Sequence, residues 1–259
     1  MSDKVLLILV DGMRPDGLTG CGDPRLGAYY QSGSYSLAAR TVWPSITLPC
    51  HVSLFHSCDP AVHGTMDNDY VHGHAMPEGL FELLTRSGKK SAMFYIWEQL
   101  RDVYQPGNIT YSWFKAWEHE PYTDLDAQAT EACMAYIREA QPDFAFLYLG
   151  ETDEYGHDYG WMSPEYLDCI RRAGDCICRV TEALPPEYSV IVTADHGGHA
   201  FAHGEDIPED MTIPICFHGP RFAGGRQLTD LSILDITPTI ADLLGLPADP
   251  EWEGHSVCD

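Results

Sequence analysis

Short apolar segments alternate with longer amphipathic segments along most of this chain. Five segments are apolar almost throughout and have the length of strands buried on both faces; they are Val5–Val10, Ser91–Ile96, Phe144–Leu149, Val190–Ala194 and Pro214–His218. Helical periodicity marks the longer segments, which are Glu78–Arg86, Asp124–Ala140, Pro164–Ala183 and Ile233–Leu244. Strands and helices that alternate in this way predict βαβ units. We therefore expect an α/β fold whose central sheet is mostly parallel and carries helices on both faces.

Length and composition indicate one globular domain. The chain has 259 residues, of which 44% are hydrophobic, and it shows no internal repeat or low-complexity stretch. A core of this size is usual for one α/β domain, so we expect residues 1–259 to form a single domain. Residues 104–121 lack clear periodicity, and we expect either a small insertion over the functional edge of the sheet or a surface connection.

The charge balance argues against polyanionic partners. Asp and Glu number 39 against 15 Lys and Arg, which gives a formal net charge of −24. A chain this acidic repels phosphate backbones and anionic membranes, so we expect neither a nucleic-acid polymer nor a membrane as partner. The N-terminal apolar run is also far shorter than the roughly 20 residues that span a bilayer. The sequence leaves the oligomeric state open.

The cysteines suggest a reducing compartment. Their number, nine, is odd and they are scattered through apolar surroundings, which predicts free thiols in a cytoplasmic protein rather than a disulfide framework. Cys169, Cys176 and Cys178 lie on one predicted helix. We interpret them as packing residues in preference to a thiolate metal site, because free cysteine is among the most buried residue types.

Acidic residues follow three of the predicted strands, and histidines accompany two of them. The carboxyl ends of parallel strands meet at one edge of a sheet, so these side chains are expected to converge. Carboxylate and imidazole groups without thiolates suit Zn²⁺ and related hydrolytic metals, and the donors suffice for two ions. The candidate ligands are Asp11, Asp153, His157, Asp195, His196 and His203.

Each candidate also has an ordinary interpretation when taken alone. Asp11 resembles a helix cap or turn residue, and His157 and His203 resemble surface or packing residues. The combination favours a metal site. His199 lies between two candidate ligands, and the sequence leaves open whether it supports them or only faces solvent.

Thr47 is the candidate nucleophile. Pro49 is suited to the first turn of a helix running to about Leu54, which places Thr47 just outside the helix N-terminus. Backbone N–H groups and the helix dipole favour an anion such as phosphate at that position. The alternative is that Thr47 only caps the helix. Cys50 is a competing nucleophile but ranks second, because no basic residue lies near it in sequence to lower its pKa.

Several ordered motifs resemble a known family. They are Val10–Asp16 (VDGMRPD), Pro44–His51 (PSITLPCH), Thr152–His157 (TDEYGH), Asp195–Gly197 (DHG), His203-Gly204 and the tail from Asp235 to Gly254. Together they resemble the alkaline phosphatase superfamily and, within it, the type I phosphodiesterase and nucleotide pyrophosphatase family. The resemblance implies an alkaline-phosphatase-like fold in a single catalytic domain. It also implies a metal-dependent hydrolase of phosphodiester or nucleotide pyrophosphate bonds, acting through a phospho-threonine on Thr47.

The same resemblance implies how two divalent ions are held, with Zn²⁺ the expected metal and Mn²⁺ the alternative. One ion has Asp153, His157 and His203 as ligands. The other has Asp11, Asp195, His196 and the Thr47 oxygen. Two ions placed in this way would activate the nucleophile and stabilise the departing oxygen.

Cys50 departs from the family pattern, in which an Asn amide usually stands at that position and binds the phosphoryl group. A thiol is a weak donor, so we expect backbone groups or another side chain to replace the amide unless the site accepts a different group. Tyr70 and Tyr155 lie in loops near the motifs and are, with Cys50, the candidate substrate-binding residues. Trp97 could likewise stack on a base or sugar, with packing as the alternative. Both tyrosines have packing as the alternative.

The absence of basic residues around Thr47 restricts the class of substrate that we expect. No Lys or Arg occurs between Thr41 and Thr85. A monoester dianion usually calls for an Arg clamp, so a small phosphodiester or nucleotide pyrophosphate is the better match. The alternatives are a phosphomonoesterase or phosphonate-bond hydrolase on the same site, or a catalytically silent metal-binding relative.

Overall fold

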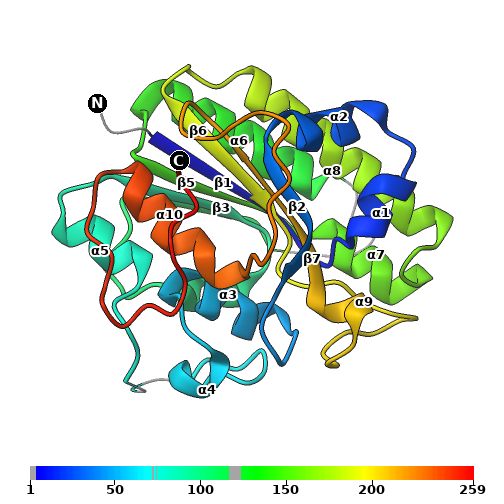
Figure 1. The fold of residues 1–259 in the computed structure, drawn as a ribbon, viewed down its shortest axis with the longest axis horizontal. Coiled ribbons are helices and arrows are strands. Elements are labelled where there is room, and N and C mark those ends of the chain that lie inside the picture. The colour runs from blue at the N-terminus through cyan, green and yellow to red at the C-terminus, as the bar shows by residue number, and fades with distance from the viewer. Residues whose placement is uncertain (1–3, 72, 74, 117–123) are drawn as a thin grey trace.

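One mixed sheet organises the protein, for which a computed structural model describes residues 4–71, 73, 75–116 and 124–259 (Figure 1). In this part of the chain the sheet has seven strands in the order β2-β7-β6-β1-β5-β3-β4. The strands are β1 (Lys4–Val10), β2 (Ser34–Arg40), β3 (Ser91–Tyr95), β4 (Tyr111–Phe114), β5 (Phe144–Leu149), β6 (Tyr188–Thr193) and β7 (Thr212–His218). All neighbours are parallel except β7, which runs antiparallel to both β6 and β2. The mostly parallel sheet predicted from the sequence is confirmed.

The three central strands form the core and end level with one another. All residues of β5 and β6 are buried, as are those of β1 after Lys4. Val10 of β1 is in register with Leu149 of β5, and Leu9 is in register with Thr193 of β6. Residues that follow these three strands therefore emerge at the same edge of the sheet.

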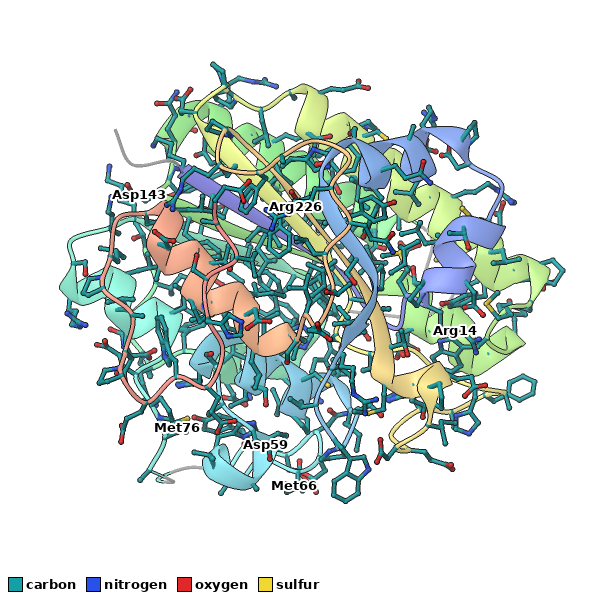
Figure 2. All side chains as sticks on the ribbon, in the orientation of Figure 1. Arg14, Asp59, Met66, Met76, Asp143 and Arg226 are labelled. Carbon is teal, nitrogen blue, oxygen red and sulfur yellow. The ribbon has the colours of Figure 1, made fainter. Side chains whose placement is uncertain are left out.

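Helices cover both faces of the sheet. Figure 1 shows α6 (Leu125–Ala140) and α8 (Pro164–Glu182) along one face, and α3 (Thr47–His56), α5 (Leu80–Arg86) and α10 (Ile236–Leu243) along the other. The remaining helical elements are α1 (Pro15–Gly20), α2 (Pro24–Ser32), α4 (Pro60–His63), η1 (Glu98–Val103), α7 (Glu151–Tyr159), α9 (Pro208–Met211) and η2 (Ile233–Asp235). In Figure 2, Asp143 lies at the amino end of the central strands and Arg14 lies toward their carboxyl end. The candidate site residues belong to the end near Arg14, because Asp11 directly follows β1.

The structure adds elements that the sequence pattern did not predict. The edge strands β2 and β4 are partly exposed and lack a continuous apolar run. Helix α3 begins at Thr47, two residues before the expected start at Pro49. Within the segment 104–121, β4 extends the sheet beside β3, while residues 117–121 lie outside the described part of the chain.

Two further observations bear on the sequence predictions. In the described ranges, none of the helices combines the length and apolar character needed to cross a bilayer. All nine cysteines are free thiols, and Cys169 and Cys176 are buried on α8, in agreement with the packing interpretation.

Candidate active site

The predicted ligands converge at the carboxyl ends of the three central strands. His196 Nε2 lies 3.3 Å from Asp11 Oδ1 and 3.4 Å from Asp195 Oδ2. On the other side of His196, the ring of His203 stacks on it with centroids 3.9 Å apart. His203 Nε2 is in turn 3.8 Å from Asp153 Oδ1. Residues from four separate parts of the chain thus form one compact group.

The turn after β1 is built to bring Asp11 close to Asp153. Gly12 has a φ of +66°, which glycine adopts without strain. A Cβ at Gly12 would lie 2.9 Å from Asp153 Oδ1, so a larger residue would also push that carboxylate away. The carbonyl of Gly12 accepts hydrogen bonds from Trp161 Nε1 (3.0 Å) and the Tyr166 hydroxyl (2.8 Å), which fix the turn.

Helix α7 presents the second pair of ligands. It starts directly after β5, and Asp153 and His157 lie four residues apart on one face of it. His157 Nε2 is 3.4 Å from Asp153 Oδ2. Because both residues lie on this helix, its backbone holds their side chains in a fixed relation to each other.

The histidines are oriented by backbone carbonyls. The Nδ1–H groups of His157, His196 and His203 donate to the carbonyls of Phe201 (3.0 Å), Gly197 (2.8 Å) and Ser45 (2.8 Å), respectively. This arrangement directs each Nε2 toward the carboxylates. Metal-binding histidines are held in the same way, with one ring nitrogen bonded to a carbonyl and the other on the ion.

Each of the three carboxylates has one oxygen without a hydrogen-bond partner among the described residues. Those oxygens are Asp11 Oδ1, Asp153 Oδ1 and Asp195 Oδ2, and all three are buried. The second oxygen of Asp11 accepts from the Tyr148 hydroxyl, and that of Asp195 accepts from the backbone N–H of Gly12. Buried polar atoms without partners are rare in folded proteins. Here three of them converge, as ligands of a cation would.

The pKa values of the buried groups also indicate that the site lacks positive charge. Burial, reinforced by the charges of Asp195 and Asp153, raises the pKa of Asp11 well above its usual value. Burial and Asp153 raise the pKa of Asp195 to about 8. Burial holds the pKa of His196 well below its usual value, so this ring does not supply the missing charge. Two divalent cations would allow these carboxylates to remain ionised at neutral pH.

Asp153 and His157 form a charge pair within the same group. The hydrogen bond to Asp153 raises the pKa of His157 to about 9. Burial would raise the pKa of Asp153, but the hydrogen bond from His157 and the neighbouring histidines outweigh it and lower that pKa. The raised pKa favours a protonated His157 beside Asp153, and these are two of the three residues to which the resemblance assigns one metal ion.

The donor geometry fits two cation sites. The described residues provide two groups whose ligand atoms lie within 4.8 Å of one another, namely Asp11, Asp195 and His196, and Asp153, His196 and His203. His196 is shared between the groups, and His157 lies beside the second through Asp153. This chemistry, carboxylates with imidazoles and no thiolate, is that of Zn²⁺ or Mn²⁺.

Thr47 lies next to the first of these groups. It is the first residue of α3, and its Oγ1 is 3.2 Å from His196 Nε2. Ile46, rather than Thr47, occupies the cap position of the helix, and no side chain caps it. Thr47 is therefore not a helix cap, and its hydroxyl is turned toward the candidate ligands.

A cavity of about 150 Å³ opens in front of Thr47 and the ligands. Trp97, a candidate for stacking on the substrate, lines it. Four further lining residues were not predicted to be functional; they are Asn68, Tyr148, Gly150 and Glu154. The carboxamide oxygen of Asn68 accepts from the backbone N–H of Leu48 at 3.1 Å. This bond fixes the amide next to Thr47 and leaves its NH₂ group as a donor for the cavity.

Asn68 changes the interpretation of Cys50. Cys50 is fully buried, and its sulfur accepts a hydrogen bond from the Thr41 hydroxyl at 3.2 Å. Burial raises the pKa of its thiol well above the usual value, which opposes a role as nucleophile. The amide expected to be missing at position 50 is instead available from Asn68.

The two tyrosines proposed to bind substrate lie outside this cavity. Tyr155 packs under the guanidinium of Arg172, 4.7 Å from the ring centroid, and beside Tyr159. Tyr70 lines a separate hollow with Arg101 and Tyr104.

His199 also lies outside the cavity, and its Nδ1 is 2.8 Å from the buried carboxylate of Asp210. It therefore supports the loop that carries the ligands His196 and His203.

Comparisons with known proteins find related sequences and structures. The sequence model of a family described as type I phosphodiesterase / nucleotide pyrophosphatase matches residues 5–210. Human ectonucleotide pyrophosphatase/phosphodiesterase family member 7 is 24% identical over 226 residues, which is 75% of this chain and 48% of the human protein. A 2,3-bisphosphoglycerate-independent phosphoglycerate mutase from Desulforudis audaxviator (strain MP104C) is 32% identical over 136 residues, 50% of this chain and 26% of the mutase. The chain spans about half or less of these curated relatives.

Solved structures show the same fold. An inactive variant of murine ectonucleotide pyrophosphatase / phosphodiesterase 5, in complex with AMP, has a TM-score of 0.80 at 17% identity, with 96% of both chains covered. A 2-O GAG sulfatase has a TM-score of 0.77 at 16% identity, with 99% of this chain and 73% of the other covered. At these identities the likeness concerns the fold, which is alkaline-phosphatase-like as expected.

Proposed function

This chain belongs to the type I phosphodiesterase / nucleotide pyrophosphatase family, and we propose that it hydrolyses phosphodiester or nucleotide pyrophosphate bonds through a phospho-threonine on Thr47. The observation that carries the proposal is the position of Thr47 Oγ1, 3.2 Å from His196 Nε2 and beside three buried carboxylates with unpartnered oxygens. A hydroxyl beside such ligands can be activated by a bound metal ion and then attack a phosphoryl group in the cavity.

Two divalent cations, when bound, would lower the pKa of the Thr47 hydroxyl and neutralise charge that develops on the leaving oxygen. Asp11, Asp195 and His196 would hold one, with Thr47. Asp153, His157 and His203 would hold the other. Zn²⁺ is the metal that we propose, with Mn²⁺ as the alternative, because both accept this mixture of oxygen and nitrogen donors.

The chain's own residues account for the rest of the reaction. The Thr47 hydroxyl loses its proton to solvent and its oxygen forms a bond to phosphorus, while the bond from phosphorus to the leaving alkoxide or phosphate breaks and that group takes up a proton. Water then attacks the phosphorus of the phospho-threonine, which releases the phosphomonoester product and restores the Thr47 hydroxyl. The NH₂ group of Asn68 is placed to donate to a non-bridging oxygen, because Leu48 already holds the amide oxygen. Pro49 has no N–H, so Asn68 takes over much of the role expected of the helix N-terminus.

The lining of the cavity favours diesters over monoesters. No lysine or arginine is among the described residues that line it. A monoester dianion would therefore lack the guanidinium clamp that usually holds such a group. We also propose a reducing compartment such as the cytoplasm, which the nine unpaired cysteines support.

Replacement of the nucleophile tests the proposal. With bis(p-nitrophenyl) phosphate and added Zn²⁺ or Mn²⁺, Thr47→Ala is expected to lower kcat by about 10³-fold or more, as loss of a nucleophile does elsewhere. Thr47→Ser retains a hydroxyl and is expected to keep measurable turnover. Acid quenching of the wild type during turnover, followed by mass spectrometry, should find a phosphoryl adduct on the peptide that contains Thr47.

A matched control is Thr19→Ala, at an exposed position on α1, which should behave as the wild type. Turnover by Thr47→Ala within tenfold of the wild type would contradict the mechanism. Absence of activity toward mono-, di- and phosphonate esters in a protein that binds two ions would instead identify a silent relative.

A further inference from the structure

His51 is a fully buried histidine beside the nucleophile, and the proposed reaction gives it no role. It lies on α3, one turn after Thr47. Its Nδ1 is 2.7 Å from the carbonyl oxygen of Thr47. Because a carbonyl oxygen can only accept a hydrogen bond, Nδ1 carries a proton and donates it. The imidazole therefore holds the backbone of the residue whose side chain is the proposed nucleophile.

The same nitrogen lies beside a candidate metal ligand. His51 Nδ1 is 3.7 Å from Asp195 Oδ2, one of the buried carboxylate oxygens without a hydrogen-bond partner among the described residues. Burial lowers the pKa of His51 to about 4, so the ring is neutral and this contact is not an ion pair. His51 thus lies between the backbone of the nucleophile and the carboxylate of the ligand group next to it.

Two side chains hold the peptide group that follows Thr47. Thr47 is the first residue of α3, where no side chain caps the helix, and helix ends fray unless they are held. His51 donates to the carbonyl oxygen of this peptide group, and Asn68 accepts from its N–H, which belongs to Leu48. A peptide group is planar and rigid, so bonds at both of its polar atoms fix its orientation. The direction of the Thr47 side chain is fixed with it.

The second ring nitrogen indicates that His51 adds little to the stability of the fold. Its Nε2 is buried and has no hydrogen-bond partner among the described residues. The ring packs edge-on against Phe146 and Tyr148, with centroid distances of 6.0 Å and 5.6 Å. A buried polar atom that is left unpaired costs at least as much free energy as one neutral hydrogen bond contributes. An apolar ring at this position would therefore suit the fold as well as histidine does.

We propose that His51 is a positioning residue for the reaction, which fixes the peptide group after Thr47 together with Asn68 and so aims the Thr47 hydroxyl at the phosphorus. The inference rests on the proposed function, in which Thr47 is the nucleophile. His51 is not among the described residues that line the cavity, so it acts through the backbone of Thr47 and not on the substrate. Its loss should slow the attack on phosphorus and leave substrate binding nearly unchanged.

Two replacements separate this role from support of the fold. His51→Phe fills the space with an apolar ring and removes the donor. His51→Asn keeps an N–H donor at the position of Nδ1, because both nitrogens are bonded to Cγ, but leaves a void in place of the rest of the ring.

The two variants should differ in opposite directions in activity and stability. With bis(p-nitrophenyl) phosphate and added Zn²⁺ or Mn²⁺, His51→Phe is expected to lower kcat by about 10- to 100-fold, since small displacements of a reacting group have effects of this size. Its KM should stay close to the wild-type value, and its Tm should be no lower than that of the wild type. His51→Asn should retain most of kcat although the void lowers its Tm. If His51 only supported the fold, activity would follow Tm.

Rapid acid quenching should place the effect in the first chemical step. The phosphoryl adduct on the peptide that contains Thr47 should form more slowly in His51→Phe than in the wild type. His51→Leu, which is smaller than Phe and also lacks the donor, should lower kcat in the same way. His56→Phe is the matched control: His56 is buried on the same helix, and its Nδ1 donates to the carbonyl of Pro77 at 2.8 Å. This variant should keep the wild-type kcat.

The possible failures of the inference and of the proposed function can be told apart. Wild-type kcat in both His51→Phe and His51→Leu would overturn the inference while the proposed function stands. Equal losses of kcat in His51→Phe and His56→Phe would also overturn it, because the effect would then belong to the helix as a whole. Absence of diester hydrolysis by the metal-loaded wild type, or full activity of Thr47→Ala, would instead contradict the proposed function.

Discussion

The hydroxyl oxygen of Thr47 lies 3.2 Å from Nε2 of His196, although 149 positions separate the two residues in the chain. Thr47 starts α3 and His196 follows β6, so the contact joins the two sides of the site across the carboxyl end of the sheet. The proposed nucleophile and a proposed metal ligand therefore lie in hydrogen-bond contact. A cation bound by His196 would therefore also act on the Thr47 hydroxyl.

Metal removal should destabilise the fold as well as stop catalysis. Three buried carboxylates then lose the cations that compensate their charge, so Asp11 and Asp195, whose pKa values are raised, must take up protons or stay ionised without a cation. A ligand present at 100 times its Kd stabilises by about 2.7 kcal/mol, which corresponds to roughly 5–10 °C in Tm for a protein of this size. Differential scanning calorimetry of chelator-treated protein should show this fall, and Zn²⁺ or Mn²⁺ should reverse it.

The control for this experiment is a protein without one ligand. Asp195→Asn should show a smaller rise in Tm on addition of Zn²⁺, because one of the two ligand groups is weakened. Identical Tm values of the wild type with chelator and with metal would be evidence against resident ions.

The metal-free protein should lose stability as the pH rises. The folded pKa of Asp195 is raised to about 8 from an ordinary value near 3.8. Its contribution to stability is therefore complete below pH 4 and disappears as the pH rises through about 8, with a slope of at most about 1.4 kcal/mol per pH unit for one proton. Urea unfolding between pH 5 and pH 8 should show decreasing free energy of unfolding.

Two variants test whether Asp195 causes this pH dependence of stability. Asp195→Asn stays uncharged and should flatten this dependence, whereas the exposed Asp230→Asn should leave it as in the wild type. Metal-loaded protein should show the opposite trend, because ligands must lose protons to bind metal. A metal-free protein that becomes more stable toward pH 8 would contradict the assignment.

The buried central strands of the sheet could be predicted from the sequence, whereas the edge strands could not. The strands β1, β5 and β6 are buried on both faces, so their residues are apolar almost without interruption and their ends are visible in the sequence. The edge strand β2 (SYSLAAR) mixes polar and apolar residues, because it is only partly covered and its pairing with β7 is interrupted by a register shift. Such a strand is defined by its neighbour and not by its own pattern.

The site residues also divide into those that the sequence pattern could predict and those that it could not. Asp11, Asp153 and Asp195 follow core strands, and that position is what made them recognisable as converging residues. Asn68 lies 20 residues beyond its partner Leu48 in a loop without periodicity, and only the folded chain brings the two together. Tyr155 does not line the cavity, because its ring packs against Arg172 from its position on α7.

Loss of the Asn68 amide should slow catalysis with little effect on metal binding. Asn68 lines the cavity, and the backbone N–H of Leu48 occupies its amide oxygen, which leaves the NH₂ group to donate. Removal of one such preorganised donor costs about 10²–10³-fold in kcat in other enzymes. Asn68→Ala should therefore lower kcat by this order while Zn²⁺ stoichiometry stays at the wild-type value. Asn108→Ala, which loses an amide bonded to Glu82 far from the site, is the matched control; equal kcat losses in the two variants would exclude a specific role for Asn68.

Asp126 and Glu151 stabilise the helix that carries Asp153 and His157. The Asp126 carboxylate accepts from the backbone N–H of Gly150 at 2.8 Å, at the start of α7. In return, the Glu151 carboxylate accepts from the backbone N–H of Asp126 at 3.1 Å, at the start of α6. Each helix thus provides an acceptor for the first N–H groups of the other. This exchange fixes where α7 leaves the sheet and so where its ligands point.

Asp126→Ala should therefore weaken metal binding as well as stability. Loss of a helix-terminal acceptor costs about 0.5–2 kcal/mol, and the displaced start of α7 should lower Zn²⁺ affinity in a competition titration. Burial and Glu151 raise the pKa of Asp126 well above its usual value, so neutral Asn is close to the protonated side chain and should be tolerated better than Ala. Glu139→Ala, at an exposed position on the same helix, should change neither quantity. If Asp126→Ala is destabilised but binds Zn²⁺ with unchanged affinity, the hydrogen bonds between Asp126 and the start of α7 stabilise the fold without positioning the ligands.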